Sequence, residues 1–166
     1  MTRSNRWAEM FLLFAVVPFV VGRSGSAVAI KAGGRDDVSK SHVLWKKSLR
    51  SYVPSPVLAG EQILSVNSDS GVLTGLSSTT GEQVFQQRLS NAGGVYASPV
   101  VIDGKVYVVT RRNGTFVVGV SGSRVTVIAE NKFDDESDFN ASPAVADGKL
   151  LLRSNRRLYC IATKSP

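Results

Sequence analysis

The feature that most constrains this chain is a Ser-Pro pair that recurs at a nearly constant interval. The pairs are Ser55-Pro56, Ser98-Pro99 and Ser142-Pro143, so successive prolines are 43 and 44 residues apart. Each pair opens a short apolar run, and proline is tolerated as the first residue of a strand because it has no N–H to donate. The residue before proline is pushed towards extended geometry. The interval therefore predicts one strand-rich unit, repeated three times.

The second repeat shows what this unit contains. Its four valine-rich runs are separated by Asp103-Gly104, Asn113-Gly114 and Ser121-Gly122. Asp-Gly and Asn-Gly tolerate the positive φ angles of two-residue hairpins, and valine favours pleated strands. We therefore predict four antiparallel strands joined by tight turns. A repeat of roughly 40 to 45 residues with this content is typical of a blade of an all-β propeller.

The blades are expected at about 55–89, 98–133 and 142–161. The third ends before a fourth strand, and residues 42–49, which resemble an isolated strand, could supply it. Because common propellers have four to eight blades, about three blades would form an incomplete ring. The apolar faces at its two ends would then stay exposed and would need a partner.

Residues 1–29 resemble a secretory signal peptide. Arg3 and Arg6 precede an apolar run from Met10 to Val21, and small residues follow as far as Ala29. This order predicts a signal-peptide helix and cleavage near Ala29, and hence a periplasmic or secreted protein. The run is shorter than the roughly 20 residues of a membrane span. An uncleaved anchor stays open as an alternative.

The rest of the chain is expected to divide into a linker at 30–41, the repeats at 42–162 and a tail at 163–166. An apolar content of 43% argues against disorder, and the net charge of +7 is mildly basic. Cys160 is the sole cysteine, so no intramolecular disulfide can form. The fold must depend on its core.

These residues resemble the pyrroloquinoline-quinone-like repeat family of bacterial β-propellers. That repeat approximates Ala-x-Asp-x-x-Thr-Gly-Lys-x-x-Trp. Thr80 and Gly81 match it, Phe85 replaces the Trp, and Trp45 matches the last position of a preceding repeat. The resemblance implies a structural signature made of Trp45, Ser55, Pro56, Thr80, Gly81, Phe85, Ser98, Pro99, Gly104, Gly114, Ser142, Pro143 and Gly148.

The segment from Ala32 to Ile161 is similar to the C-terminal blades of exported, BamB-like propellers. Some members of the wider family are quinone-dependent dehydrogenases, and others are scaffolds of outer-membrane protein assembly. The resemblance therefore implies the fold more firmly than it implies the activity.

Catalysis has little support in the sequence. Quinone enzymes of this family use calcium-binding and catalytic carboxylates, and several use adjacent cysteines, which this chain lacks. His42 is the only candidate for a base, and it belongs to an expected outer strand. Asp134 to Asp138 offer oxygen ligands for calcium but lack the glycine-punctuated spacing of a calcium loop, so a solvated loop is favoured. We expect no enzyme, cofactor or metal site.

Five arginines form the one candidate binding site. They follow the second strand of repeats two and three at equivalent places: Arg111, Arg112, Arg153, Arg156 and Arg157. On one rim they could bind an anionic partner, such as an acidic protein or a cell-surface polymer. The alternative is solubilising charge at loop tips. Nucleic acid is disfavoured because no aromatic and basic platform accompanies the arginines.

The sequence therefore favours a non-enzymatic, exported scaffold or protein-interaction module, with cell-envelope assembly as one setting. It would bind a protein partner, or a second copy of itself, through its blade end faces. Two alternatives stay open. One is a relative or fragment of a quinone-dependent dehydrogenase, and the other is a truncated remnant without independent function.

Overall fold

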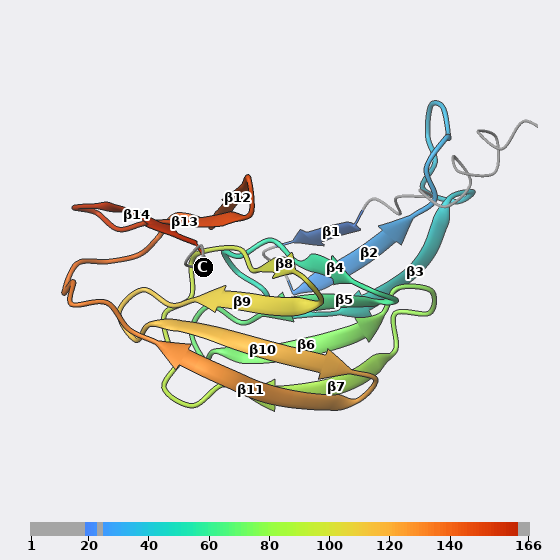
Figure 1. The fold of residues 1–166 in the computed structure, drawn as a ribbon. Helices are drawn as coiled ribbons and strands as arrows, with labels where there is room; N and C mark the ends of the chain where they lie inside the picture. The colour runs from blue at the N-terminus through green and yellow to red at the C-terminus, as the bar shows by residue number, and fades with distance from the viewer. Residues whose placement is uncertain (1–18, 23–24, 163–166) are drawn as a thin grey trace, which may run out of the picture.

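The computed structural model describes residues 19–22 and 25–162, and within them the chain forms fourteen strands and no helix. The strands make four antiparallel sheets that follow one another in chain order (Figure 1). This confirms the all-β fold built from propeller-like blades. It also adds one sheet to the three that were expected.

The first sheet contains β1 (Phe19–Gly22), β2 (Ser26–Ile30) and β3 (Val43–Ser48). The second contains β4 (Val57–Ala59), β5 (Gln62–Val66), β6 (Val72–Ser77) and β7 (Gln83–Arg88). The third contains β8 (Val100–Ile102), β9 (Lys105–Val109), β10 (Thr115–Ser121) and β11 (Arg124–Asn131). The fourth contains β12 (Ala144–Ala146), β13 (Lys149–Arg153) and β14 (Leu158–Ile161). Figure 1 shows the first and fourth sheets at opposite ends of the molecule.

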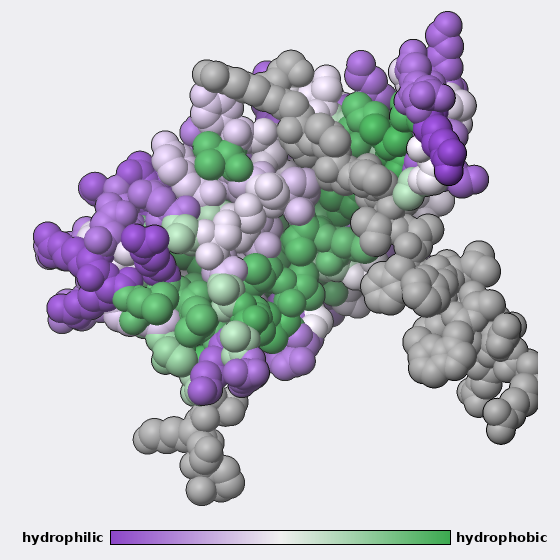
Figure 2. All heavy atoms as spheres, turned by 90° about the horizontal axis from the view of Figure 1, so that it is seen from above, coloured by the Kyte–Doolittle hydropathy of each residue, from purple (hydrophilic) through white to green (hydrophobic). Residues whose placement is uncertain are grey.

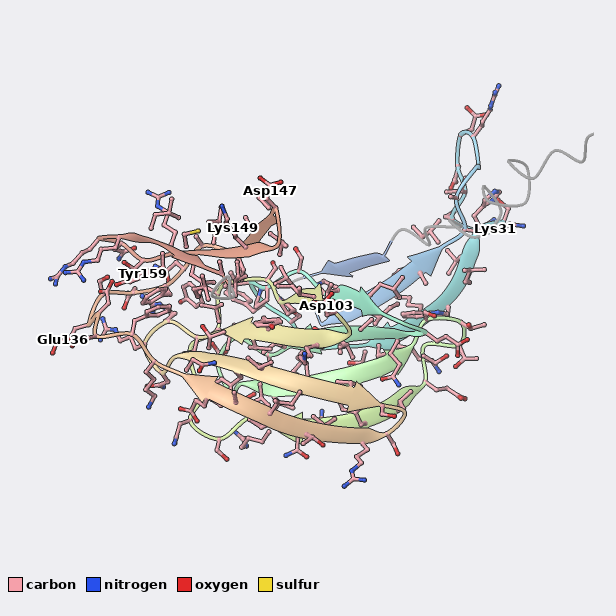
Figure 3. The ribbon with its side chains drawn as sticks, in the orientation of Figure 1. Lys31, Asp103, Glu136, Asp147, Lys149 and Tyr159 are labelled. Atoms are coloured by element: carbon pink, nitrogen blue, oxygen red, sulfur yellow. The ribbon has the colours of Figure 1, made fainter. Side chains whose placement is uncertain are left out.

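The turns follow the sequence prediction. Asp103 and Gly104 both have positive φ, 48° and 70°, and Asp147 and Gly148 repeat these values at 48° and 68°. Asp103 and Asp147 thus mark equivalent hairpins of the third and fourth sheets (Figure 3). Successive positive φ angles are what a two-residue hairpin matched to strand twist requires.

The first sheet differs from one expectation. The described strands at 19–22 and 26–30 overlap the expected signal-peptide helix at 1–29, whereas the expected linker at 30–41 does connect β2 to β3 apart from its first residue, Ile30. Residues 1–18, 23–24 and the tail at 163–166 lie outside the described residues, so cleavage near Ala29 stays a prediction.

The prediction that residues 42–49 close the third repeat is wrong. β3 pairs with β2, with Ser26 opposite Ser48, and the fourth sheet has the order β12-β13-β14. The pairing is local: the Lys31 N–H donates to the His42 carbonyl at 2.8 Å, closing the hairpin. Closing a short loop costs less entropy than bringing β3 to a strand more than a hundred residues away.

The core lies between consecutive sheets. The largest cluster joins the second and third sheets through Leu64, Leu73, Phe116 and Val118 among others. A smaller cluster joins the first and second sheets, and another joins the third and fourth. Each sheet is therefore stabilised mainly by its neighbours, as in other repeat proteins.

The recurring serines link the sheets at their inner strands. The Ser55 N–H donates to the Ser98 hydroxyl at 2.9 Å, and the Ser98 N–H donates to the Ser142 hydroxyl at 2.9 Å. In the third and fourth sheets the Ser-Pro pair thus does two things: its proline opens the strand, and its serine accepts a bond from the preceding sheet. This second role explains the serine at positions 98 and 142.

The turn that contains Thr80 and Gly81 packs against Trp45 of the preceding sheet. The Trp45 indole N–H donates to the Ser78 carbonyl at 3.0 Å. Gly81 has φ +69°, and a Cβ there would lie 2.5 Å from the Trp45 ring. Gly81 is therefore needed for both its backbone conformation and its lack of a side chain.

Candidate functional site

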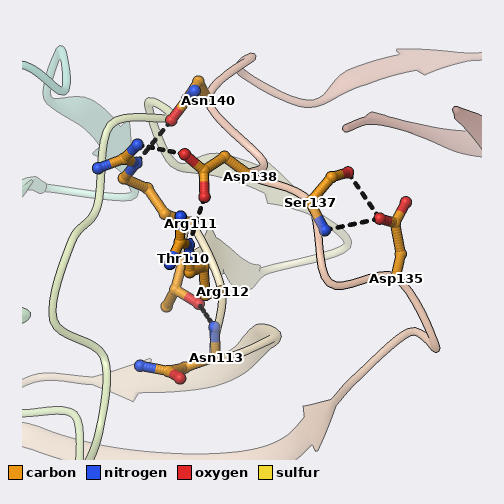
Figure 4. A network of polar contacts seen from close by, with 8 residues as sticks. All are labelled: Thr110, Arg111, Arg112, Asn113, Asp135, Ser137, Asp138 and Asn140. Carbon is orange, nitrogen blue, oxygen red and sulfur yellow. Dashed lines mark hydrogen bonds and ion pairs between the residues drawn. The ribbon is translucent and has the colours of Figure 1, made fainter. Parts of the chain in front are cut away.

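The five arginines of the expected rim separate into two groups. Arg111 and Arg112 lie at the end of β9, and both bind the carboxylate of Asp138 (Figure 4). Arg112 Nε is 2.5 Å from Asp138 Oδ1, and Arg111 Nε donates to Asn140 Oδ1 at 2.9 Å. The Arg111 guanidinium also lies over the Tyr96 ring, 4.6 Å from its centroid.

These contacts link the third sheet to the segment that leads into the fourth, and we call Arg111, Arg112 and Asp138 the clamp. Hydrogen bonding by Arg112 holds the pKa of Asp138 below its usual value, so the carboxylate stays charged. The backbone adds bonds at the same place, from the Phe139 N–H to the Arg111 carbonyl and from the Asn155 N–H to the Asp138 carbonyl, both at 2.9 Å. Because Asp138 neutralises part of their charge, Arg111 and Arg112 are poorly suited to a free anion.

Arg153, Arg156 and Arg157 form the second group, at the end of β13 and in the turn before β14. All three are exposed, and none forms an ion pair within the part of the chain that the structure describes. The Ser154 hydroxyl accepts from the N–H groups of Arg156 and Arg157 at 3.1 and 2.9 Å, which fixes their turn. Anion binding stays a prediction, and it now concerns these three residues.

The acidic segment before the fourth sheet is held by hydrogen bonds. Asp135 accepts bonds of 2.6 Å from the Ser137 hydroxyl and 2.7 Å from the hydroxyls of Ser154 and Tyr159. These bonds, that from Ser137 first, hold the pKa of Asp135 well below its usual range. The bond to Asp135 raises the pKa of Tyr159, which lies at the end of the fourth sheet nearest Glu136 (Figure 3).

Two candidates for catalysis or metal binding came from the sequence, His42 and the acidic segment from Asp134 to Asp138, and neither has further catalytic or metal-binding residues grouped around it in the described part of the chain. Across residues 19–22 and 25–162, no three His, Cys, Asp or Glu side chains gather in a way that could hold a metal ion. The His42 Nδ1 lies 2.8 Å from the hydroxyl of its neighbour Ser41 in an exposed connection. Asp135 and Asp138, which offered ligands for calcium, are occupied by structural bonds.

Sequence reasoning missed the partners of the arginines. Asp138 was assigned to a solvated loop, and Tyr96 and Asn140 carried no signal. Arg112 and Asp138 are 26 residues apart, so only the packing of consecutive sheets brings them together. The equivalent spacing of Tyr96 and Asn140 before their Ser-Pro pairs could have indicated that both reach the same place.

The fourth sheet carries an exposed apolar surface at its outer face and edge, with Leu158 and Ile161 both exposed. Seen from above the view of Figure 1, apolar side chains also form a band across the molecule (Figure 2). Leu158 is 68% exposed, although its counterpart in the second sheet, Leu73, is fully buried in the cluster shared with the third sheet. Within the described residues no strand pairs with the outer side of β14, whereas β6 and β10 at the same place pair with β7 and β11. We call β14 with the outward face at Leu151, Leu158 and Cys160 the open edge.

Comparisons with known proteins agree with this architecture. A profile of the family described as outer membrane protein assembly factor BamB matches residues 23–131. Among solved structures, BamB from Moraxella catarrhalis is similar, with a TM-score of 0.65 and 19% sequence identity. The similarity covers 86% of this chain and 42% of that protein, so the chain spans less than half of its length. No curated protein matches the chain.

The profile begins within the expected leader, which agrees with the strand found at Ser26–Ile30. Within the described residues, no helix is long and apolar enough to cross a membrane. The pyrroloquinoline-quinone-like repeats predicted from the sequence are thus confirmed by both the profile and the fold. Because the profile covers more than half of the chain, this protein belongs to the family of the outer membrane protein assembly factor BamB.

Proposed function

We propose that this protein is a non-enzymatic scaffold of the cell envelope that binds an extended strand of a protein partner at the open edge. The family and its propeller fold support a role in protein interaction in general. The observation that carries the finer proposal is that β14 has no strand paired to its outer side within the described residues, next to the exposed apolar face at Leu158. An exposed sheet edge offers unpaired N–H and C=O groups to an added strand.

The second and third sheets indicate which strand would fit. In the second sheet, Gly75 lies opposite Phe85, and a Cβ on Gly75 would lie 2.2 Å from that ring. In the third sheet, Val117 lies opposite the small Ala129. Cys160 holds the equivalent place in β14, so the incoming strand should carry a small residue opposite it.

Charge further restricts the partner. In β11, Glu130 follows Ala129 and lies opposite Phe116, which corresponds to Tyr159 in the fourth sheet. An acidic residue there would lie towards the turn that holds Arg156 and Arg157. A strand with an alternating apolar face, a small residue and then an acidic residue therefore complements the open edge. The segment Arg124–Asn131 has this pattern and serves as a probe.

The test titrates a fluorescent peptide of sequence Arg124–Asn131 into the full chain and measures anisotropy. We expect saturable binding by the wild-type chain and loss of binding when the peptide carries Ala129→Phe. The Cys160→Gly chain should accept that bulky peptide, as Gly75 accepts Phe85. Equal binding of both peptides to both chains, or no binding at all, would overturn the proposal.

The non-enzymatic part of the proposal has its own measurement. Pyrroloquinoline quinone is added to the purified chain with calcium, and the absorbance of the bound quinone is followed through gel filtration. We expect the quinone to elute apart from the protein. Co-elution in a fixed ratio, with reduction of an artificial electron acceptor on addition of an alcohol, would favour the dehydrogenase alternative.

A further inference from the structure

A polar groove separates the first and second sheets. It has a volume of about 760 Å³ and extends along β6, from the β5–β6 turn at Asn67 to the β6–β7 turn at Glu82. The end of β3 forms one wall, and β6 and β7 form the other, so the groove belongs to two sheets. Apart from Leu49, Val72, Leu76 and Gly81, its lining side chains are polar.

The interface between the second and third sheets shows which residues occupy the equivalent positions in an apolar core. Ser65 and Thr74 are cross-strand partners on the face that the second sheet turns to the first. Their counterparts in the third sheet, Val108 and Phe116, are also partners, and both are buried in the main core. The interface between the second and third sheets is therefore apolar at these positions. The interface between the first and second sheets keeps a smaller apolar cluster, and beside it the same positions are polar and the groove opens.

This polarity opposes folding. Ser65 is 1% exposed, and its hydroxyl has no partner among the described residues. A buried hydroxyl without a hydrogen bond costs free energy that valine at the same position would not. Thr74 next to it has only a long bond, 3.5 Å, from the Gln86 amide. Of the two, Thr74 lines the groove, whereas Ser65 is not part of its lining. A polar side chain with weak hydrogen bonding that lines a cavity is typical of a binding site.

The chemistry of the lining selects the ligand. Lys47 and Arg50 are balanced by Asp69 and Glu82, so the groove has no excess charge to attract an ion. Its other polar groups, including those of Thr74 and Gln86, are neutral amides and hydroxyls that can both donate and accept. The groove follows a six-residue strand, about 20 Å long. It thus suits an elongated, neutral, polyhydroxylated molecule.

A peptide fits this groove less well. The walls present side chains from the faces of two sheets, whereas an extended peptide gains most from the backbone groups of a sheet edge. The apolar pockets that would select peptide side chains are also few here. We propose that the groove between the first and second sheets binds a neutral oligosaccharide. This site is independent of the open edge at β14.

Isothermal titration calorimetry of the full chain with two neutral sugars, N,N′,N″-triacetylchitotriose and maltotriose, tests the proposal. At least one should bind in a 1:1 ratio with a Kd below about 1 mM. Thr74→Val combined with Gln86→Leu should weaken binding at least about tenfold. Gln87→Leu, on the same strand but outside the groove lining, is the matched control and should bind as the wild type does.

Thr74→Val alone separates a binding role from a structural one, because Thr74 lines the groove and Ser65 does not. It should weaken sugar binding without lowering Tm. Ser65→Val should raise Tm, because it removes an unpaired buried hydroxyl, and it should leave sugar binding unchanged. A lower Tm with unchanged binding in Thr74→Val would assign Thr74 to the fold alone and overturn its role in the groove. The proposal is overturned if neither sugar binds at about 10 mM, or if the groove variants bind like the wild type. It is also overturned if the Arg124–Asn131 peptide, but neither sugar, shifts the amide resonances of β6.

Discussion

At the scale of single residues, the contact between Trp45 and Gly81 gives the sharpest stability prediction. Gly81→Ala would place a methyl group against the indole in addition to the strain of a positive φ. Gly60 is the matched control, since it has φ +58° and open space around its Cβ position. We expect about 1–2 kcal/mol of destabilisation for Gly60→Ala, and about 1–3 kcal/mol more for Gly81→Ala.

Denaturant unfolding of the two glycine variants measures this difference. If both variants lose the same free energy of unfolding, the contact between Gly81 and Trp45 adds nothing to the cost of backbone strain. The Thr-Gly signature would then need another explanation. Trp45→Ala should remove most of the difference, because no ring would then oppose the new methyl group.

Asp135 makes the stability depend on pH. Its pKa is lowered in the folded state, so its stabilisation is complete above the unfolded pKa of about 3.9 and is lost as the pH falls below it. Asp135→Asn should therefore be less stable than the wild type at pH 7. That gap should begin to narrow as the pH falls below about 4 and should close as the pH falls further, through the lowered pKa of the folded state. Thermal melts across this pH range measure the gap, and a gap that persists at low pH would contradict the assignment.

At the scale of the elements, short sequence patterns predicted the features that depend on neighbouring residues. The Ser-Pro interval predicted the second, third and fourth sheets, and the Asp-Gly turns predicted the first hairpin of the third and fourth, because each hairpin depends on a few adjacent residues. The first sheet was missed for a physical reason. Ala27 and Ala29 match the small residues of a cleavage site, and equally the small residues that pack beside Trp45, where both are fully buried. Only the three-dimensional contact separates the two readings.

The candidate sites show the same limit. The equivalent positions of the arginines were visible in the sequence, but the clamp at Asp138 depends on how two sheets pack. The polar groove was invisible for a similar reason. Ser65 and Val108 are both common residues in strands. That one is polar and the other apolar becomes informative only when the fold shows that they hold equivalent positions at two interfaces.

The fourth sheet should be the least protected of the three that were predicted. It meets the third sheet through a small cluster around Phe139, which stacks with Phe133 and Tyr159 at centroid distances of 5.7 and 5.8 Å. Phe139→Ala should cost about 3–5 kcal/mol in this sheet. Hydrogen exchange should then accelerate in β12–β14 while β5, β6, β9 and β10 keep their protection. Uniform acceleration would show that the sheets unfold as one unit.

At the scale of the whole molecule, two opposing effects decide whether the chain stays monomeric. The open edge presents Leu158 and an unpaired strand, which favour association with a second copy when no partner is present. The net charge of +7 opposes it, and salt screens that repulsion. We therefore expect the mass measured by light scattering to rise above 17.8 kDa with concentration, and to rise further at high salt.

Leu158→Lys identifies the surface responsible for that association. It adds a charge to the exposed edge without filling any buried space, so the fold should be retained and the mass should return to that of one chain. Val127→Lys, which charges an exposed apolar residue on β11 of the third sheet, is the control and should leave association unchanged. A chain that stays monomeric at every salt concentration would mean that the open edge is too weak to recruit a strand. In that case the scaffold role would have to rest on another surface, such as the turn with Arg153, Arg156 and Arg157.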